Sequence, residues 1–104
     1  MFEIIKNMFS KVDNNLAQIV NDEAFLVDVR SPLEFLSEKV KGSINIPVDQ
    51  IQNHLEKFKD KGNIVVFCRS GARSIQAKAI LERNGITNVT NGGTWQNVES
   101  LLTK

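Results

Sequence analysis

The chain has 104 residues, of which 41% are hydrophobic and 24% are charged, and its formal net charge is +1 at pH 7. This length predicts one domain with a modest core, and a charge this close to zero gives no indication of a nucleic-acid or membrane partner. No window approaches a membrane span, and residues 1–9 lack the long apolar run and cleavage site of a secretory signal. We therefore expect a single cytoplasmic domain over residues 1–104, with residues 1–12 as a candidate N-terminal extension.

Cysteine and histidine occur once each, as Cys68 and His54. A lone cysteine cannot form an internal disulfide, so the fold needs no oxidising compartment, and a reducing one keeps the thiol available. His54 has no second histidine or cysteine near it to complete a metal site, and we expect it on the polar side of its helix. We predict neither a metal nor a cofactor.

The first part of the chain contains the patterns of two helices and two strands. They are an amphipathic helix over 2–9, an edge strand over 10–12, a helix that begins at 13–14 and ends at 21–22, and a buried strand over 24–29. Asp28 interrupts the last of these strands, and because a carboxylate rarely lies unpaired in a core, we expect Arg30 to be its partner. Ser31 and Glu34 then form a capping-box pattern with Pro32 at the first helical position, which predicts a helix start.

The rest of the chain alternates strands and helices. The predicted elements are a strand over 44–46, a helix over 48–58 with one core face, a strand over 64–67, a helix from 72 to 83, a strand over 86–90, a turn over 91–93 and a closing helix from 95. Apolar strands that alternate with helices predict an α/β fold of three layers, α/β/α, with a central, mainly parallel sheet of about five strands. Trp95 is expected to pack in the core or at its rim.

Cys68 lies at the carboxyl end of the predicted strand over 64–67, just before the next helix. The first turn of a helix has unpaired N–H groups that favour an anion, and a thiolate is such an anion. Arg69 and Arg73 add positive charge, and Gly71 lets the backbone turn so that several N–H groups point at one centre. We therefore predict a nucleophilic thiolate in a loop that can hold a small oxyanion.

The loop that contains the cysteine resembles the active-site loop of single-domain rhodanese-family sulfurtransferases. It reads Cys68-Arg69-Ser70-Gly71-Ala72-Arg73-Ser74. Three further segments are similar to the family's successive signatures and extend the resemblance over residues 13–100: Leu26–Arg30 with Glu34-Phe35, Lys41–Pro47, and Asn91–Gly93 with Trp95. One departure is that Glu38-Lys39 stands where the family commonly has Gly-His.

The resemblance implies a sulfurtransferase with a rhodanese-like fold. In such an enzyme the Cys68 thiolate takes the outer sulfur of an anionic donor such as thiosulfate, holds it as a persulfide, and passes it to cyanide or a cellular thiol. The resemblance assigns donor binding and persulfide stabilisation to the rest of the loop, Arg69 to Ser74, and a bracing role to Asp28 and Arg30. The implied partners are the anionic donor, the thiol acceptor and a sulfur-relay protein.

Three alternatives remain open. The first is a non-autonomous persulfide carrier, or a module of this fold that binds a protein partner. The second is a cysteine-dependent phosphatase or arsenate reductase, whose loop has five residues between cysteine and arginine, whereas four separate Cys68 from Arg73. The third is a buried structural thiol, because free cysteine is among the most buried residue types.

Overall fold

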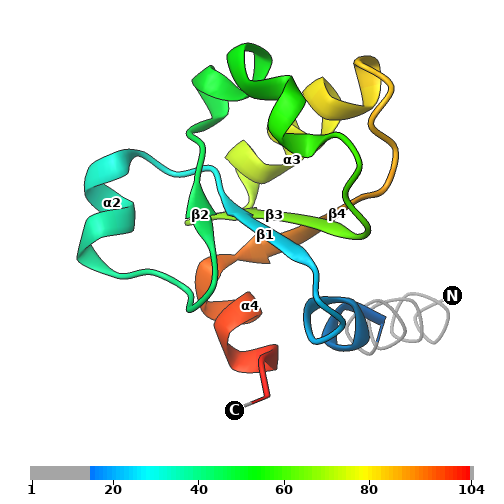
Figure 1. Ribbon diagram of the computed structural model, residues 1–104. Helices are drawn as coiled ribbons and strands as arrows, with labels where there is room; N and C mark the ends of the chain where they lie inside the picture. The colour runs from blue at the N-terminus through cyan, green and yellow to red at the C-terminus, as the bar shows by residue number, and fades with distance from the viewer. Residues whose placement is uncertain (1–14, 104) are drawn as a thin grey trace, which may run out of the picture.

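A computed structural model describes residues 15–103 (Figure 1). The helix predicted over 2–9, the strand predicted over 10–12 and the N-terminal extension lie outside the described residues. The described elements are a helix over 15–20, β1 (Phe25–Asp28), α2 (Pro32–Ser37), β2 (Ile44–Asn45), η1 (Val48–Phe58), β3 (Ile64–Cys68), α3 (Ala72–Arg83), β4 (Val89–Thr94) and α4 (Trp95–Leu101). None of the helices in this part of the chain has both the length and the hydropathy needed to span a bilayer.

The described strands form one sheet of order β2-β1-β3-β4, in which all neighbours are parallel. This confirms the predicted parallel sheet, which has four strands within residues 15–103 where about five were expected over the whole chain. All five residues of β3 are buried, as an uninterrupted apolar run predicts for a strand between two covered faces. The central position of β3 therefore follows from its sequence.

Helices cover both faces of the sheet, which confirms the three-layer arrangement. Figure 1 shows η1 and α3 on one side of the strands, and α4 with the helix over 15–20 on the other. Each side has its own apolar cluster. Side chains of β3 alternate between the two clusters, so that Val65 and Phe67 pack on the α4 side while Val66 and Cys68 pack on the η1 and α3 side. The alternation thus fixes the face on which the thiol lies.

The predicted capping box at the start of α2 is present. The Ser31 hydroxyl accepts the Glu34 N–H at 3.3 Å, and a Glu34 carboxylate oxygen accepts the Ser31 N–H at 3.1 Å. Pro32 occupies the first helical position, where a backbone N–H would have no partner within the helix, so its absence in proline costs no hydrogen bond. This local motif fixes both the start of α2 and the direction of the Glu34 side chain.

The segment over 48–58 differs from the predicted continuous helix. It is a 3-10 helix in which His54 has non-helical backbone angles, φ −131° and ψ 31°. Because a 3-10 helix turns by about 120° per residue, seven residues of uninterrupted 3-10 helix would separate Ile51 from Phe58 by roughly a third of a turn. The break at His54 corrects this, and both side chains are fully buried on the sheet side, as the apolar spacing predicts.

The last strand lies later in the chain than predicted. β4 continues to Thr94 and includes Asn91–Gly93, which were predicted as a turn. Its register against β3 shifts at Gly92, an extra residue that forms a β-bulge. A Cβ on Gly92 would lie 2.7 Å from Val98 Cγ2 and 2.9 Å from Val65 Cγ1, so only glycine fits between β3 and α4 here. Gly92, which indicates a turn in the sequence, therefore forms the bulge and allows the close contact, whereas Gly93 has a positive φ of +79°.

We expect Gly92→Ala to destabilise the fold by about 1–3 kcal/mol, because the two valines it would contact are β-branched, fully buried and unable to move aside. Urea unfolding measures the difference. The matched control is Gly62→Ala, where an added Cβ meets no atom within 4 Å. Equal stability of the two variants would contradict the close packing described for Gly92.

Candidate active site

The Cys68 side chain is fully buried at the carboxyl end of β3. Only residues 69–71 separate this strand from α3. The last of them, Gly71, is the N-cap of α3 and has φ +96°, a left-handed conformation that favours glycine. Nothing would lie within 4 Å of a Cβ at this position, so the backbone angle and not lack of space explains the glycine. The tight turn brings the start of α3 back over the sulfur.

The loop and the first turn of α3 surround the sulfur with hydrogen-bonding groups. The Gly71 N–H donates to Cys68 Sγ at 2.9 Å, and the Ser74 hydroxyl oxygen lies 3.7 Å from Sγ. While the thiol is protonated, it donates to the Ser74 hydroxyl oxygen, and the hydroxyl donates its one hydrogen to the Gly71 carbonyl at 2.9 Å. When the thiol ionises, this hydrogen can turn to the sulfur. Although Cys68 packs in an apolar cluster, its sulfur faces these donors as the sequence predicts.

The groups around the sulfur favour its ionised form. Burial raises the pKa of the Cys68 thiol, but hydrogen bonds from the Ser74 backbone and hydroxyl and from the backbone of Gly71 and Ser70 lower it, and the net pKa is below its ordinary value. The sequence also predicted a contribution from Arg69 and Arg73. Their guanidinium groups are not among the largest influences on this pKa, so the loop amides and the Ser74 hydroxyl are the main source of the stabilisation.

Arg73 is held by Glu34, for which the sequence predicts only a role in helix capping. The guanidinium donates to both carboxylate oxygens, from Nη1 to Oε1 at 2.7 Å and from Nη2 to Oε2 at 3.0 Å. Mainly through this hydrogen bond, Arg73 lowers the pKa of Glu34 from 4.5 to about 2, and Glu34 raises the pKa of Arg73. The pair joins α2 to the first turn of α3. The sequence indicates this ion pair only indirectly, because the capping box uses one carboxylate oxygen of Glu34 and leaves the other available.

The expected pair of Asp28 and Arg30 is present and buried. The Asp28 carboxylate accepts from the Arg30 backbone N–H at 3.0 Å and from the guanidinium Nε at 2.9 Å and Nη2 at 2.6 Å. The same Nη2 donates to the Glu38 carbonyl at 2.5 Å. The guanidinium also lies over the half-buried Trp95 ring, 5.3 Å from its centroid. Arg30 therefore connects the end of β1 with the segment after α2 and the start of α4.

A cavity of about 340 Å³ lies beside the loop. Its lining residues are Arg30, Glu34, Ser37, Glu38, Arg69, Trp95 and Gln96. Arg69 directly follows the cysteine, and Trp95 directly follows Thr94, the β4 residue that pairs with Cys68 across the sheet. The cavity therefore adjoins the carboxyl end of β3, where ligands bind in open parallel sheets. We call it the loop-side pocket.

The remaining predicted residues have simpler surroundings. The Ser70 and Ala72 side chains are exposed, and Ser70 acts on the thiol through its backbone. His54 is partly exposed, with Nδ1 4.0 Å from a Glu56 carboxylate oxygen. Within residues 15–103 no three or more His, Cys, Asp or Glu side chains gather as metal ligands would.

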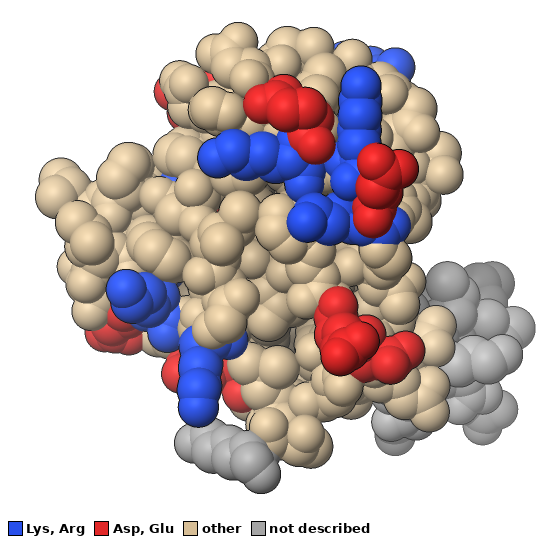
Figure 2. Space-filling view, in the orientation of Figure 1, with Lys and Arg blue, Asp and Glu red and all other residues tan. Residues whose placement is uncertain are grey.

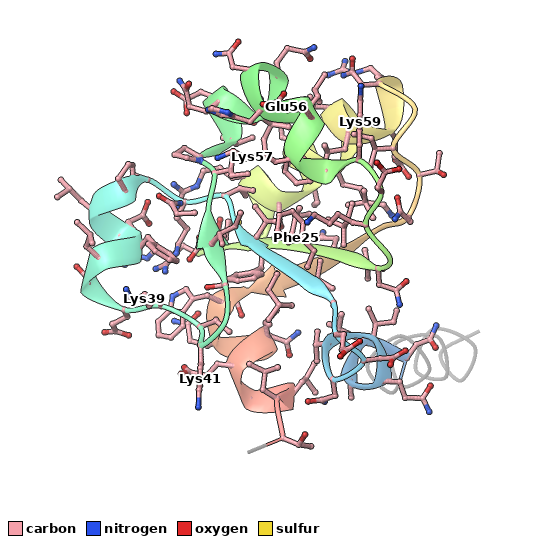
Figure 3. The ribbon with its side chains drawn as sticks, viewed as in Figure 1. Phe25, Lys39, Lys41, Glu56, Lys57 and Lys59 are labelled. Carbon is pink, nitrogen blue, oxygen red and sulfur yellow. The ribbon has the colours of Figure 1, made fainter. Side chains whose placement is uncertain are left out.

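The two residues that depart from the family pattern point to different places. Glu38 lines the loop-side pocket. The Lys39 ammonium lies 5.2 Å from the centroid of the Phe35 ring, and Figure 3 shows both Lys39 and Lys41 at the segment between α2 and β2, away from η1. Of the two departures, Glu38 is the one that changes the surroundings of the candidate site.

Charges of both signs are mixed on the visible surface of the molecule. In Figure 2, Lys and Arg side chains alternate with Asp and Glu at the top of the view, over the region that η1 forms. Uncharged residues separate this group from the charged side chains in the lower part of the view. This face therefore presents no broad field of one sign.

The comparisons with known proteins agree on one family. The rhodanese-like domain family matches residues 11–94. The chain belongs to this family. It is 41% identical to thiosulfate sulfurtransferase PspE of Escherichia coli over 64% of this chain and 66% of that protein, and 32% identical to a sulfurtransferase of Allochromatium vinosum over 81% of each. Among solved structures, a rhodanese with anions from E. coli has a TM-score of 0.65 and 34% identity, over 71% of this chain and 89% of that one.

In this rhodanese-like domain, we expect Ser74→Ala to raise the pKa of the Cys68 thiol, because the variant loses one of the hydrogen bonds that favour the thiolate. Thiolate absorbance or the pH dependence of alkylation measures the pKa. Ser70→Ala is the matched control, since Ser70 acts through a backbone N–H that the variant keeps. If Ser74→Ala left the titration unchanged, the hydroxyl would have no influence on the sulfur.

We expect Glu34→Gln to destabilise the domain at neutral pH by about 1 kcal/mol, a modest value because the Glu34 and Arg73 side chains are 26% and 33% exposed. Glutamine can still complete the capping box, so the variant isolates the bond to Arg73. Since folding lowers the pKa of Glu34 from 4.5 to about 2, the pair stabilises the fold fully above the higher value, and this contribution is lost as pH falls toward the lower one.

Urea unfolding at several pH values tests this dependence. The stability difference between wild type and Glu34→Gln is expected to shrink as pH falls from 6 toward about 2. The exposed Glu82 of α3 provides the control variant Glu82→Gln. A difference for Glu34→Gln that stays constant across this range would contradict the assigned ion pair.

Proposed function

We propose that this chain is a sulfurtransferase that moves a sulfane sulfur from a donor such as thiosulfate to cyanide or a cellular thiol through a persulfide on Cys68. The observation that carries the proposal is the set of donors around one ionisable sulfur, with the Gly71 N–H 2.9 Å from Sγ and the Ser74 hydroxyl beside it. The family match and the relatives that are named sulfurtransferases support the same activity.

The reaction proceeds in two displacements at sulfur. The Cys68 thiolate attacks the outer sulfur of thiosulfate, a new S–S bond forms, and the old S–S bond breaks with its electron pair on the departing sulfite. An acceptor nucleophile then attacks the outer sulfur of the persulfide, and the electron pair of the second S–S bond returns to Sγ. Each displacement balances by itself, so neither an external oxidant nor an external reductant is required.

The loop stabilises the anions that form in both steps. The N–H groups of Ser70, Gly71 and Ser74 are directed at the sulfur, and they stabilise the thiolate before loading and the persulfide anion afterwards. The outer sulfur of a persulfide lies about 2 Å from Sγ, so the atom that the acceptor attacks is displaced from the buried position of Sγ itself. Arg69, which is exposed beside Cys68, attracts the anionic donor.

The two ion pairs hold this loop in position. Glu34 fixes Arg73 at the start of α3, and Asp28 fixes Arg30 at the wall of the loop-side pocket. Since both guanidinium groups are bound to carboxylates, they act by positioning the backbone and closing the site. We assign them no contact with the reacting sulfur.

A phosphatase requires its arginine on the bound oxyanion. Both Nη1 and Nη2 of Arg73 instead donate to Glu34, a residue of α2 that is not part of the loop. This arrangement favours sulfur transfer over phosphate or arsenate chemistry.

We further propose a single domain over residues 1–104 that works in the reducing cytoplasm, where a lone thiol stays available and a sulfur-relay protein can supply or receive the sulfur.

We expect wild-type protein treated with thiosulfate to gain the mass of one sulfur atom on Cys68 and to lose it again on addition of cyanide, with release of thiocyanate. Cys68→Ser is expected to show neither change, because a hydroxyl does not replace the thiolate as nucleophile. Intact-mass spectrometry and a thiocyanate assay measure the two half-reactions. Lys57→Gln, on an exposed residue of η1, is the control for the effect of substitution itself.

Two results would change the proposal. Wild type that takes no sulfur from thiosulfate but does take it from a persulfide-bearing protein would indicate a carrier and not an autonomous enzyme. Equal cyanolysis by wild type and Cys68→Ser, or efficient hydrolysis of aryl phosphates, would overturn it.

A further inference from the structure

The loop-side pocket contains more charge than the transfer of sulfur from thiosulfate requires. Four of its seven lining side chains are ionisable: two arginines and two glutamates. A pocket for a small anion alone needs no carboxylate, because a carboxylate repels an anion at close range. The question is which of these four charges remain available to a ligand.

Two of the four charges are already compensated within the fold. Arg30 is buried and donates to the Asp28 carboxylate through Nε and Nη2. Glu34 is bound through both carboxylate oxygens to Arg73. These two groups form the wall of the pocket without offering net charge to a ligand.

The other two charges, Arg69 and Glu38, have no hydrogen bond or ion pair from their side chains to any residue in the range 15–103. Both side chains are exposed and both line the same cavity. The pocket therefore offers one free cation and one free anion, separated by no more than the width of a cavity of about 340 Å³. This size lies at the small end of ligand pockets.

The other lining residues suit a short and partly apolar molecule. Trp95 presents an indole ring that Arg30 covers at 5.3 Å, and this ring offers an apolar surface to methylene groups. Ser37 and Gln96 add neutral polar groups. A ligand with one ammonium, one carboxylate and a short carbon skeleton matches both the charges and the surface.

The pocket adjoins the strand end that carries the nucleophile. Arg69 directly follows the nucleophile, and Trp95 directly follows Thr94, which pairs with Cys68 across the sheet. A molecule seated between these residues lies beside the start of the sulfur loop, at the strand end that carries the nucleophile.

We propose that the loop-side pocket is the acceptor site and selects a small zwitterionic thiol of the amino-acid type, whose ammonium pairs with Glu38 and whose carboxylate pairs with Arg69. This inference rests on the proposed function and specifies its second half-reaction. The acceptor thiolate forms a bond to the outer sulfur, the bond from that sulfur to Cys68 Sγ breaks, and its electron pair regenerates the Cys68 thiolate. The product is the acceptor persulfide, and no net oxidation occurs.

The test measures discharge of preloaded protein by four small thiols that differ in charge. They are cysteine as the zwitterion, cysteamine as the cation, 3-mercaptopropionate as the anion and 2-mercaptoethanol as the neutral reference. Protein is loaded with thiosulfate, or with polysulfide where thiosulfate loads a variant poorly, and the excess donor is removed. Second-order rate constants for loss of the added sulfur are determined by mass spectrometry at low ionic strength and expressed per thiolate.

We expect cysteine to discharge wild type faster than the neutral reference does. Glu38→Gln is expected to lower the rates with cysteine and cysteamine about two- to five-fold relative to 2-mercaptoethanol, the size of effect that one exposed ion pair produces. Arg69→Gln is expected to lower the rates with cysteine and 3-mercaptopropionate by a similar factor. The matched controls Glu82→Gln and Arg83→Gln change the same charges on exposed residues of α3 that do not line the pocket.

Two outcomes would overturn the inference while leaving the proposed function intact. One is that loaded wild type discharges at the same rate per thiolate with all four thiols. The other is that the pocket variants change the four rates by one common factor, or no more than the control variants do. Failure of wild type to take up sulfur from either donor is a separate result, seen in the mass spectrum before any acceptor is added, and it would overturn the proposed function itself.

Discussion

A strand buried on both faces gives its last side chain only two directions, and in β3 this choice determines where the chemistry can occur. Alternation along β3 sends Cys68 to the side that η1 and α3 cover, directly beneath the turn into α3. A sulfur on the opposite face would lie under α4, away from the amides of this turn. The position of the nucleophile is thus a property of the sheet, whereas its ionisation is a property of the loop.

The surroundings of the loop depend on two ion pairs of different character. The pair of Asp28 and Arg30 is buried and shares its guanidinium with a carbonyl and an indole ring, so its charge is fully used inside the fold. The pair of Glu34 and Arg73 is partly exposed and joins α2 to α3 through two residues that are 39 positions apart in the sequence. Both pairs leave the loop-side pocket with fewer free charges than its composition suggests. Arg30 and Glu34 are neutralised within the fold, and Arg69 and Glu38 are the charges that an acceptor can meet.

Most of the fold could be predicted because its signals are local. The apolar run of β3 and the capping box of α2 each depend on neighbouring residues, and both are present. Gly92 was misassigned to a turn because the reason for a glycine there, the close approach of Val65 and Val98, comes from residues on two other elements. The break in η1 at His54 was missed because apolar spacing constrains which side chains face the core but not the type of helix.

The candidate site shows the same division between local and distant signals. Cys68, Gly71 and Ser74 act on one another over six residues, so the sequence sufficed to bring them together. The bond between Glu34 and Arg73 could not be read from the sequence, because helix packing decides which of several nearby acids and bases meet. Likewise, the sequence marked Glu38 as a departure, but only the folded arrangement of β3, α2 and α4 places it in the same cavity as Arg69.

The indole that walls the loop-side pocket has a practical consequence. The chain contains one tryptophan and no tyrosine, so Trp95 dominates its intrinsic fluorescence. Because this ring is half-buried and stacked against Arg30 beside the sulfur loop, its emission responds to the polarity and charge at that place alone. The protein thus has a built-in optical reporter, through which loading of the sulfur and occupation of the pocket can be followed in real time without any attached dye.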